Sequence, residues 1–136
     1  MTLEQVQDLF WHKSGLLGMS GVSSDMRDLE DSTAPEAREA VDFFIYRVVR
    51  ELGSLAAAMG GIDGMVFTAG IGEHSPLVRG RVLQAASWLG FELDEAANAK
   101  DGPLLTTPGS RLWARVIPTN ENLMIARHVL RAYSRG

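Results

Sequence analysis

The sequence predicts an α/β fold built from two strand-and-helix units and one long helix. Three observations support this class. Residues 33–59 carry a sustained apolar repeat of about 3.6 residues. Two short apolar runs, 65–69 and 112–117, are each followed by a helix start signal. The length of 136 residues suits one domain, and 46% hydrophobic residues are enough to form a core.

Composition excludes several classes of function. The 13 basic and 17 acidic side chains give a net charge of -4, which argues against a nucleic-acid partner. With no cysteine there is no disulfide, zinc-cysteine site or thiol nucleophile, so ligands must be oxygen or nitrogen atoms. No apolar stretch approaches the roughly 18 residues of a membrane span, and residues 1–11 lack a signal-peptide pattern. We therefore expect a cytoplasmic protein without a membrane partner.

The first part of the chain predicts two short helical segments separated by a loop. Thr2 and Gln5 form a capping-box pattern, which indicates a helix over residues 2–12. Residues 15–21 contain three glycines and are predicted to be a loop. Ser24 is a candidate cap for a short helical turn that follows.

The strongest signal is the long helix that begins near Thr33. Its expected capping box pairs Thr33 with Glu36, and Gly60 and Gly61 end it. Its charged face is interpreted as solvated surface, and so is the acidic stretch that leads into it. That stretch comprises Asp28, Glu30, Asp31, Glu36 and Glu39.

The run at 65–69 does not alternate strictly, which predicts a parallel strand buried on both faces. A glycine-rich loop at 70–74 follows, and Ser75 with the proline after it starts a helix that ends at Gly90.

The signals between residues 91 and 110 are weaker. We expect a short strand at 91–93 and a helical turn at 95–100. A second strand at 112–117 precedes a last helix, which Thr119 or Asn120 caps and in which His128 is expected to be half-buried.

The chemistry is expected where these strands end. Ligands of parallel sheets collect outside the carboxyl ends of the strands, here at residues 70–74 and 119–122. Glycines at 70 and 72 would let backbone approach a phosphate or a purine closely. The motif is neither a dinucleotide fingerprint, because Ser75 occupies the third glycine position, nor a Walker A loop. A tight turn and a nucleotide site both fit it.

Two further groups allow a functional and a structural interpretation. Glu121 opens the last helix, where it is either a charge that favours the helix dipole or an oxygen ligand for magnesium that also contacts phosphates. Asp25 and Arg27 either hold a ribose or purine or form a surface ion pair.

Three stretches together resemble the C-terminal part of acetate kinases. These are residues 13–29 (Lys-Ser-Gly-Leu-Leu-Gly-Met-Ser-Gly-Val-Ser-Ser-Asp-Met-Arg-Asp-Leu), 66–74 (Val-Phe-Thr-Ala-Gly-Ile-Gly-Glu-His) and 117–127 (Ile-Pro-Thr-Asn-Glu-Asn-Leu-Met-Ile-Ala-Arg). Their order and spacing agree with the family over residues 12–130. Propionate and butyrate kinases are near relatives of that family.

The resemblance implies an incomplete actin-like ATPase domain, of the ribonuclease H-like class that sugar kinases share, spanning residues 1–136. It implies reversible transfer of the γ-phosphoryl of ATP to acetate, with ATP/ADP and magnesium as cofactors. The adenosine pocket would take Asp25, Met26 and Arg27, and Glu121 would be the magnesium ligand. The nucleotide loop would comprise Gly70, Ile71, Gly72, Glu73 and His74.

The sequence departs from the family pattern at two positions. His74 stands where the family has asparagine, and Asn122 replaces a second glutamate that would have closed a capping box with Thr119.

The resemblance covers only the C-terminal part of the family, so the catalytic residues and the short-chain carboxylate site are expected upstream of this chain. The isolated chain is then expected to be inactive. Two strands with exposed edges predict a homodimer or association with the missing segment. The alternative is a non-catalytic nucleotide-binding or assembly module.

Overall fold

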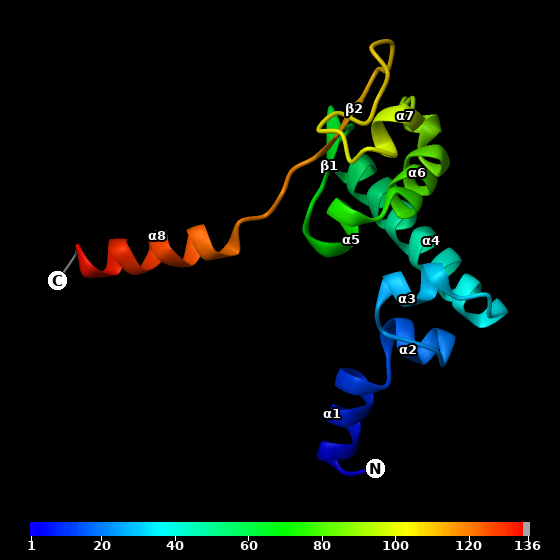
Figure 1. Ribbon diagram of the computed structural model, residues 1–136, viewed down its shortest axis with the longest axis vertical. Helices are drawn as coiled ribbons and strands as arrows, with labels where there is room; N and C mark the ends of the chain where they lie inside the picture. Colours follow the sequence, from blue (N-terminus) through cyan, green and yellow to red (C-terminus); the bar gives the residue numbers. More distant parts are fainter. Residues whose placement is uncertain (135–136) are drawn as a thin grey trace.

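A computed structural model describes residues 1–134, which form an α/β unit with two outlying helices (Figure 1). In chain order the elements are α1 (Leu3–His12), α2 (Gly15–Ser20), α3 (Met26–Asp31), α4 (Pro35–Ala58), β1 (Gly64–Phe67), α5 (Ala69–His74), α6 (Pro76–Ala85), η1 (Ser87–Leu89, a 3-10 turn), α7 (Glu95–Asn98), β2 (Trp113–Val116) and α8 (Glu121–Tyr133). The predicted class, with two strand-and-helix units and one long helix, is confirmed.

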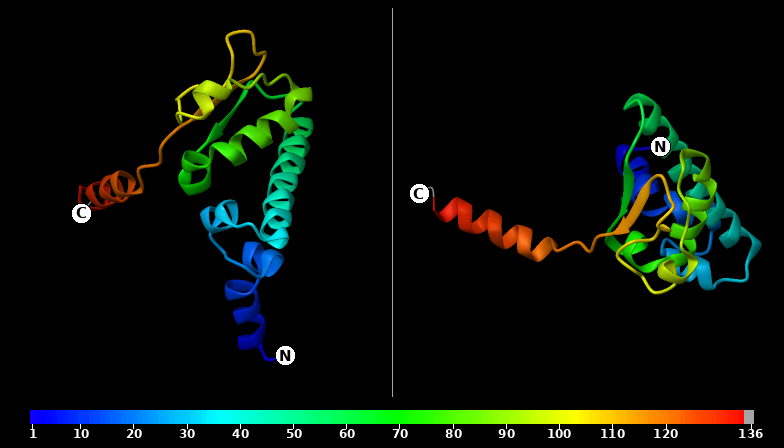
Figure 2. Two further views of the ribbon diagram at one scale, coloured as in Figure 1. Left: turned by 45° about the vertical axis from the view of Figure 1, so that its right-hand side comes forward. Right: turned by 90° about the horizontal axis from the view of Figure 1, so that it is seen from above.

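The two strands pair in parallel, with Gly64 opposite Trp113 and Phe67 opposite Val116. Helices α4 and α6 lie on one side of them (Figure 2). The core between the helices and the sheet includes Ala37, Ala40, Val41, Ile45, Phe67, Val78, Val82, Leu83, Ala114 and Val116.

The other face of the sheet is open. Val66 is 42% exposed and Trp113 is 41% exposed. The prediction of a strand buried on both faces is therefore wrong, because the helices that pack on the sheet cover only its other side.

The start of α4 differs from its predicted form. The helix begins with Pro35 at its first position, and its cap is Ala34, which makes no side-chain hydrogen bond. Glu36 is then the second residue of the helix rather than the third, so the capping box between Thr33 and Glu36 does not form. The predicted extent of the helix holds, since it ends at Ala58, just before the two glycines.

The first helices are partly as predicted. The capping box of α1 is present: the Gln5 backbone N–H donates to Thr2 Oγ1 at 3.3 Å, and the Thr2 N–H donates to Gln5 Oε1 at 2.8 Å. The predicted loop at 15–21 is instead helix α2, because Gly15 and Gly21 stand at its two ends with positive φ and only Gly18 lies inside.

The region after Gly90 is less regular than predicted. No strand forms at 91–93, where Leu93 makes only an isolated bridge with Thr106. Residues 103–106 run antiparallel to the outer edge of β2, and the Leu105 N–H donates to the Ala114 carbonyl at 2.8 Å. Only the edge of β1 is therefore left unpaired within the described chain, not both edges as predicted.

Asn120 caps α8 by accepting from the Leu123 N–H at 2.9 Å. Thr119 is not the cap, so a glutamate at position 122 would not have closed a capping box, and that prediction is wrong. An extended segment carries α8 away from the body of the molecule (Figures 1 and 2). No described residue of α8 is buried, so His128 is exposed and not half-buried as predicted.

In the described part of the chain, no helix combines the length and the apolar character needed to cross a bilayer.

Candidate functional site

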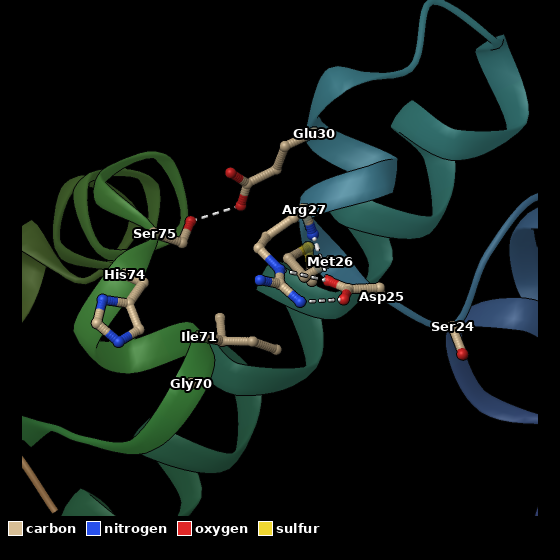
Figure 3. A pocket seen from close by; sticks show the side chains of 9 residues that line it. All are labelled: Ser24, Asp25, Met26, Arg27, Glu30, Gly70, Ile71, His74 and Ser75. Carbon is tan, nitrogen blue, oxygen red and sulfur yellow. Dashed lines mark hydrogen bonds and ion pairs between the residues drawn. The ribbon is translucent and has the colours of Figure 1, made fainter.

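Two stretches that are 45 residues apart in sequence form one pocket of about 510 Å³. One wall comes from α3 and the two residues before it, and the other comes from α5 and the first residue after it (Figure 3). This volume lies in the range of small-molecule sites. The lining residues are Ser24, Asp25, Met26, Arg27, Glu30, Gly70, Ile71, His74 and Ser75.

On the α3 wall, Asp25 and Arg27 form a two-point ion pair. Arg27 Nε donates to Asp25 Oδ1 at 3.1 Å, and Nη2 donates to Oδ2 at 2.6 Å. Asp25 also caps α3 by accepting from the Arg27 backbone N–H at 2.9 Å, so the predicted cap at Ser24 is wrong. These hydrogen bonds lower the pKa of the Asp25 carboxyl to about 2, and those from the Arg27 side chain have the largest effect.

The ion pair stands on an anchored helix, but its arginine side chain is exposed to solvent. Met26 is buried in the core and anchors α3. The Arg27 side chain is 82% exposed, although its N–H groups are held by Asp25. A guanidinium held in this way offers a flat cationic face, which is suited to stacking on an aromatic ring.

A hydrogen bond between side chains joins the two walls. Ser75 Oγ donates to Glu30 Oε1 at 2.5 Å and accepts from the Val78 N–H at 3.0 Å (Figure 3). The hydroxyl that caps α6 therefore also holds α3 against it. Glu30 was predicted only as part of the solvated acidic stretch, so its place in the pocket was not foreseen. Its position one helical turn after Arg27 was a signal that could have found it.

On the other wall, the predicted glycine loop is the short helix α5. Its first residue, Ala69, has a φ of 58°, a left-handed conformation that side chains other than glycine rarely adopt. Gly70, Ile71 and His74 line the pocket. Gly72 instead lies against β1, where a Cβ would stand 3.1 Å from the Phe67 carbonyl carbon. The residues of the loop motif are thus divided between positions that line the pocket and positions that pack against the strand.

Glu73 neither lines the pocket nor packs against β1; it bonds to Thr119. Its Oε1 accepts from both the backbone N–H and the hydroxyl of Thr119, each at 2.9 Å. These two hydrogen bonds lower the pKa of the Glu73 carboxyl, and the bond from the Thr119 backbone N–H has the larger effect. Glu73 is therefore absent from the pocket lining that the sequence predicted for it.

Buried Arg79 clamps the end of α5. Its Nη1 donates to the carbonyl of Gly72 at 3.1 Å and to that of Glu73 at 2.8 Å. Its Nε donates to Asn98 Oδ1 at 3.0 Å, and it also pairs with Asp101. A fully buried guanidinium with this many partners fixes α5 to α6 and α7.

Glu121, the predicted magnesium ligand, is not part of this pocket. It is the exposed first residue of α8 and lines a separate shallow cavity with Thr119, Asn120, Met124 and Ile125. Within residues 1–134, no three histidine, aspartate or glutamate side chains gather closely enough to enclose a metal. One carboxylate still fits magnesium, which commonly binds through one or two carboxylates with water and phosphate oxygens.

The chemistry of the main pocket suits a flat ligand with polar edges. Met26 and Ile71 supply apolar surface, and the Arg27 guanidinium supplies a stacking face. Ser24, Asp25 and His74 add hydrogen-bonding groups to the lining.

Comparison with known proteins gives one consistent family. The model of the acetokinase family matches residues 1–127. An acetate kinase of Rhodopseudomonas palustris strain TIE-1 is 52% identical over 138 residues, which cover 100% of this chain and 35% of that protein. An acetate kinase of Rhizobium meliloti is 52% identical over 130 residues, or 96% of this chain and 33% of that protein.

Solved structures agree with these matches. The Porphyromonas gingivalis acetate kinase superposes with a TM-score of 0.87 at 34% identity, covering 96% of this chain and 34% of that one. A Francisella tularensis propionate kinase gives 0.84 at 30% identity, covering 93% and 33%. The chain therefore spans about a third of the length of the relatives that it matches.

Proposed function

The chain belongs to the acetokinase family, and from this membership we propose that it supplies the nucleotide- and magnesium-binding part of an acetate kinase. The whole reaction would transfer the γ-phosphoryl group of ATP reversibly to acetate, giving acetyl phosphate and ADP. The observation that carries the proposal is the pocket between α3 and α5. It joins two of the three motifs by which the sequence resembles the family.

Within this pocket we assign the adenosine moiety to Asp25, Met26 and Arg27 on one wall and to Gly70, Ile71 and His74 on the other. The purine would lie between the Arg27 guanidinium and the Ile71 side chain, where it loses contact with water on both faces. Gly72 and Glu73 belong to the same motif, but their contacts with Phe67 and Thr119 make them supports of the site.

Magnesium would be held through Glu121, directly or through water, together with phosphate oxygens of the nucleotide. When bound, the ion would neutralise charge on the phosphates during transfer. The chain's own contribution is to present this carboxylate at the end of β2, on the segment that Thr119 ties to α5.

Catalysis is proposed to need more than this chain. Phosphoryl transfer depends on positioning and charge stabilisation from both sides of the transferring group. The acetate site is assigned to the part of the family's length that this chain does not span. We therefore expect no acetyl phosphate formation by the 136-residue chain in a coupled assay with acetate and Mg-ATP, and measurable turnover would contradict this assignment.

Calorimetric titration of the chain with ADP tests the pocket assignment. Gly70 lines the pocket, and a Cβ there would meet no atom within 4 Å. Gly70→Leu should therefore leave the fold intact and fill part of the pocket, with ADP affinity falling about tenfold or more. An unchanged affinity, with the melting temperature also unchanged, would place the nucleotide elsewhere.

A further inference from the structure

Glu73 lies in the motif that we associate with the nucleotide, yet it is not among the residues that line the pocket. It accepts two hydrogen bonds from Thr119, which is 46 residues further along the chain and stands just before α8. A carboxylate that receives two donors from one residue holds that residue in both position and orientation.

Glu73 is itself well anchored. Its backbone carbonyl accepts from Arg79 Nη1 at 2.8 Å, and the Arg79 side chain is 0% exposed. Arg79 is tied in turn to Asn98 of α7. The Glu73 carboxylate therefore projects from a fixed helix end. Its two hydrogen bonds with Thr119 hold Thr119 at a fixed place relative to α5.

The segment that Glu73 holds has few other anchors. No described residue of α8 is buried, and the exposed residues 117–120 before it lead away from the sheet (Figure 2). Two further bonds tie this stretch to the body, both at Ile117: Thr68 Oγ1 donates to the Ile117 carbonyl at 2.8 Å, and the Ile117 N–H donates to the Phe67 carbonyl at 2.9 Å. Glu121 follows Thr119 by two residues, so its location depends directly on these ties.

We propose that Glu73 is a positioning residue that sets the place of the Glu121 carboxylate relative to the nucleotide pocket, and so couples binding of the divalent cation to binding of the nucleotide. This inference rests on the proposed function, because it takes Glu121 as the magnesium ligand. It differs from a nucleotide contact in its consequence. Without Glu73, the pocket between α3 and α5 keeps its walls, but the cation no longer strengthens nucleotide binding.

The test measures ADP affinity of the full chain in EDTA and in excess Mg²⁺, for the unmodified chain and three variants. Glu73→Ala removes the acceptor, and Glu73→Gln restores an acceptor oxygen without charge. Glu39→Ala is the matched control, because Glu39 is an exposed residue of α4 outside the pocket lining. We expect Mg²⁺ to tighten ADP binding by about fivefold or more in the unmodified chain, a typical coupling between sites.

In Glu73→Ala, we expect the affinity in EDTA to stay within about twofold of the unmodified value and most of the Mg²⁺ enhancement to disappear. Glu73→Gln should recover part of the enhancement, and Glu39→Ala should retain all of it. Equal loss of affinity with and without Mg²⁺ would make Glu73 a nucleotide contact and overturn the proposal. Full enhancement in Glu73→Ala would overturn it as well.

A second readout needs neither nucleotide nor metal. In the ¹⁵N spectrum, the Thr119 amide should shift and lose protection from hydrogen exchange in Glu73→Ala, while the amides of α6 stay unchanged. An unaltered Thr119 amide would show that the tie does not hold this segment.

The two readouts distinguish a failure of the proposed function from a failure of the positioning role of Glu73. If the unmodified chain bound no ADP in either condition, the proposed function would fail and this coupling with it. A normal ADP affinity with an unchanged Thr119 amide would overturn the positioning role alone.

Discussion

At the scale of single residues, the pair of Asp25 and Arg27 carries the clearest electrostatic signature. Two bonds from the Arg27 side chain hold the pKa of Asp25 near 2, below its usual 3.8. A carboxyl with a lowered pKa stabilises the fold fully above pH 3.8, and that contribution is lost as the pH falls through about 2. Titration of the Asp25 carboxyl by NMR should give a midpoint near 2, and in Arg27→Ala the midpoint should rise toward 3.8. Equal midpoints would disprove the pair.

Arg27 should also affect ligand affinity, but modestly. A cation stacked on an aromatic ring at an exposed site contributes about 0.5–1 kcal/mol, so Arg27→Ala is predicted to weaken ADP binding about two- to fivefold. Arg50→Ala, which removes an exposed arginine of α4 outside the pocket, is the control and should leave the affinity unchanged. Calorimetry of both variants makes the comparison. An identical effect of the two substitutions would indicate general charge attraction rather than a contact.

At the scale of elements, two glycines of α5 have different roles: Gly70 lines the pocket, and Gly72 packs against β1. Gly72 packs against the Phe67 backbone, so the methyl group of Gly72→Ala is predicted to destabilise the fold by about 1–3 kcal/mol. Gly70→Ala should cost nothing and can add up to about 1 kcal/mol, since the position is open and alanine favours helix. Urea unfolding of the two variants measures this difference. Equal stabilities would contradict the close packing of α5 on β1.

The elements also show which features local sequence can predict. Caps at Thr2 and Ser75, and the repeat of α4, depend on neighbours within one or two turns, so the sequence predicted them correctly. The count of glycines at 15–21 misled because two of the three stand at helix ends, where positive φ is useful.

Contacts between distant residues were beyond such reasoning. Ser75 meets Glu30 across 45 positions, and Glu73 meets Thr119 across 46. Two of the three motifs lie in the segments that form the pocket, whereas the third, which contains Glu121, lies outside it. The motifs did not predict that Gly72 and Glu73 support the pocket from outside.

At the scale of the whole molecule, much apolar surface is uncovered. One face of the sheet exposes Val66 and Trp113, β1 pairs only with β2 within the described chain, and no described residue of α1 or α8 is buried. Exposed apolar side chains on the two helices include Leu3, Phe10, Trp11, Met124, Ile125, Val129, Leu130 and Tyr133.

Surfaces of this kind favour association. We predict that the chain self-associates at micromolar concentration, and that light scattering after size exclusion gives a mass above that of one chain. A single monomeric species at these concentrations would contradict this.

We infer that α3 and α5 together form one adenosine pocket, and a backbone NMR titration with millimolar ADP and Mg²⁺ tests this inference. We expect the amides of Asp25, Arg27, Ile71 and His74 to shift together along one binding curve, while those of α1 stay in place. If none of these four amides responded, or only those of one wall did, the two walls would not form a shared nucleotide pocket.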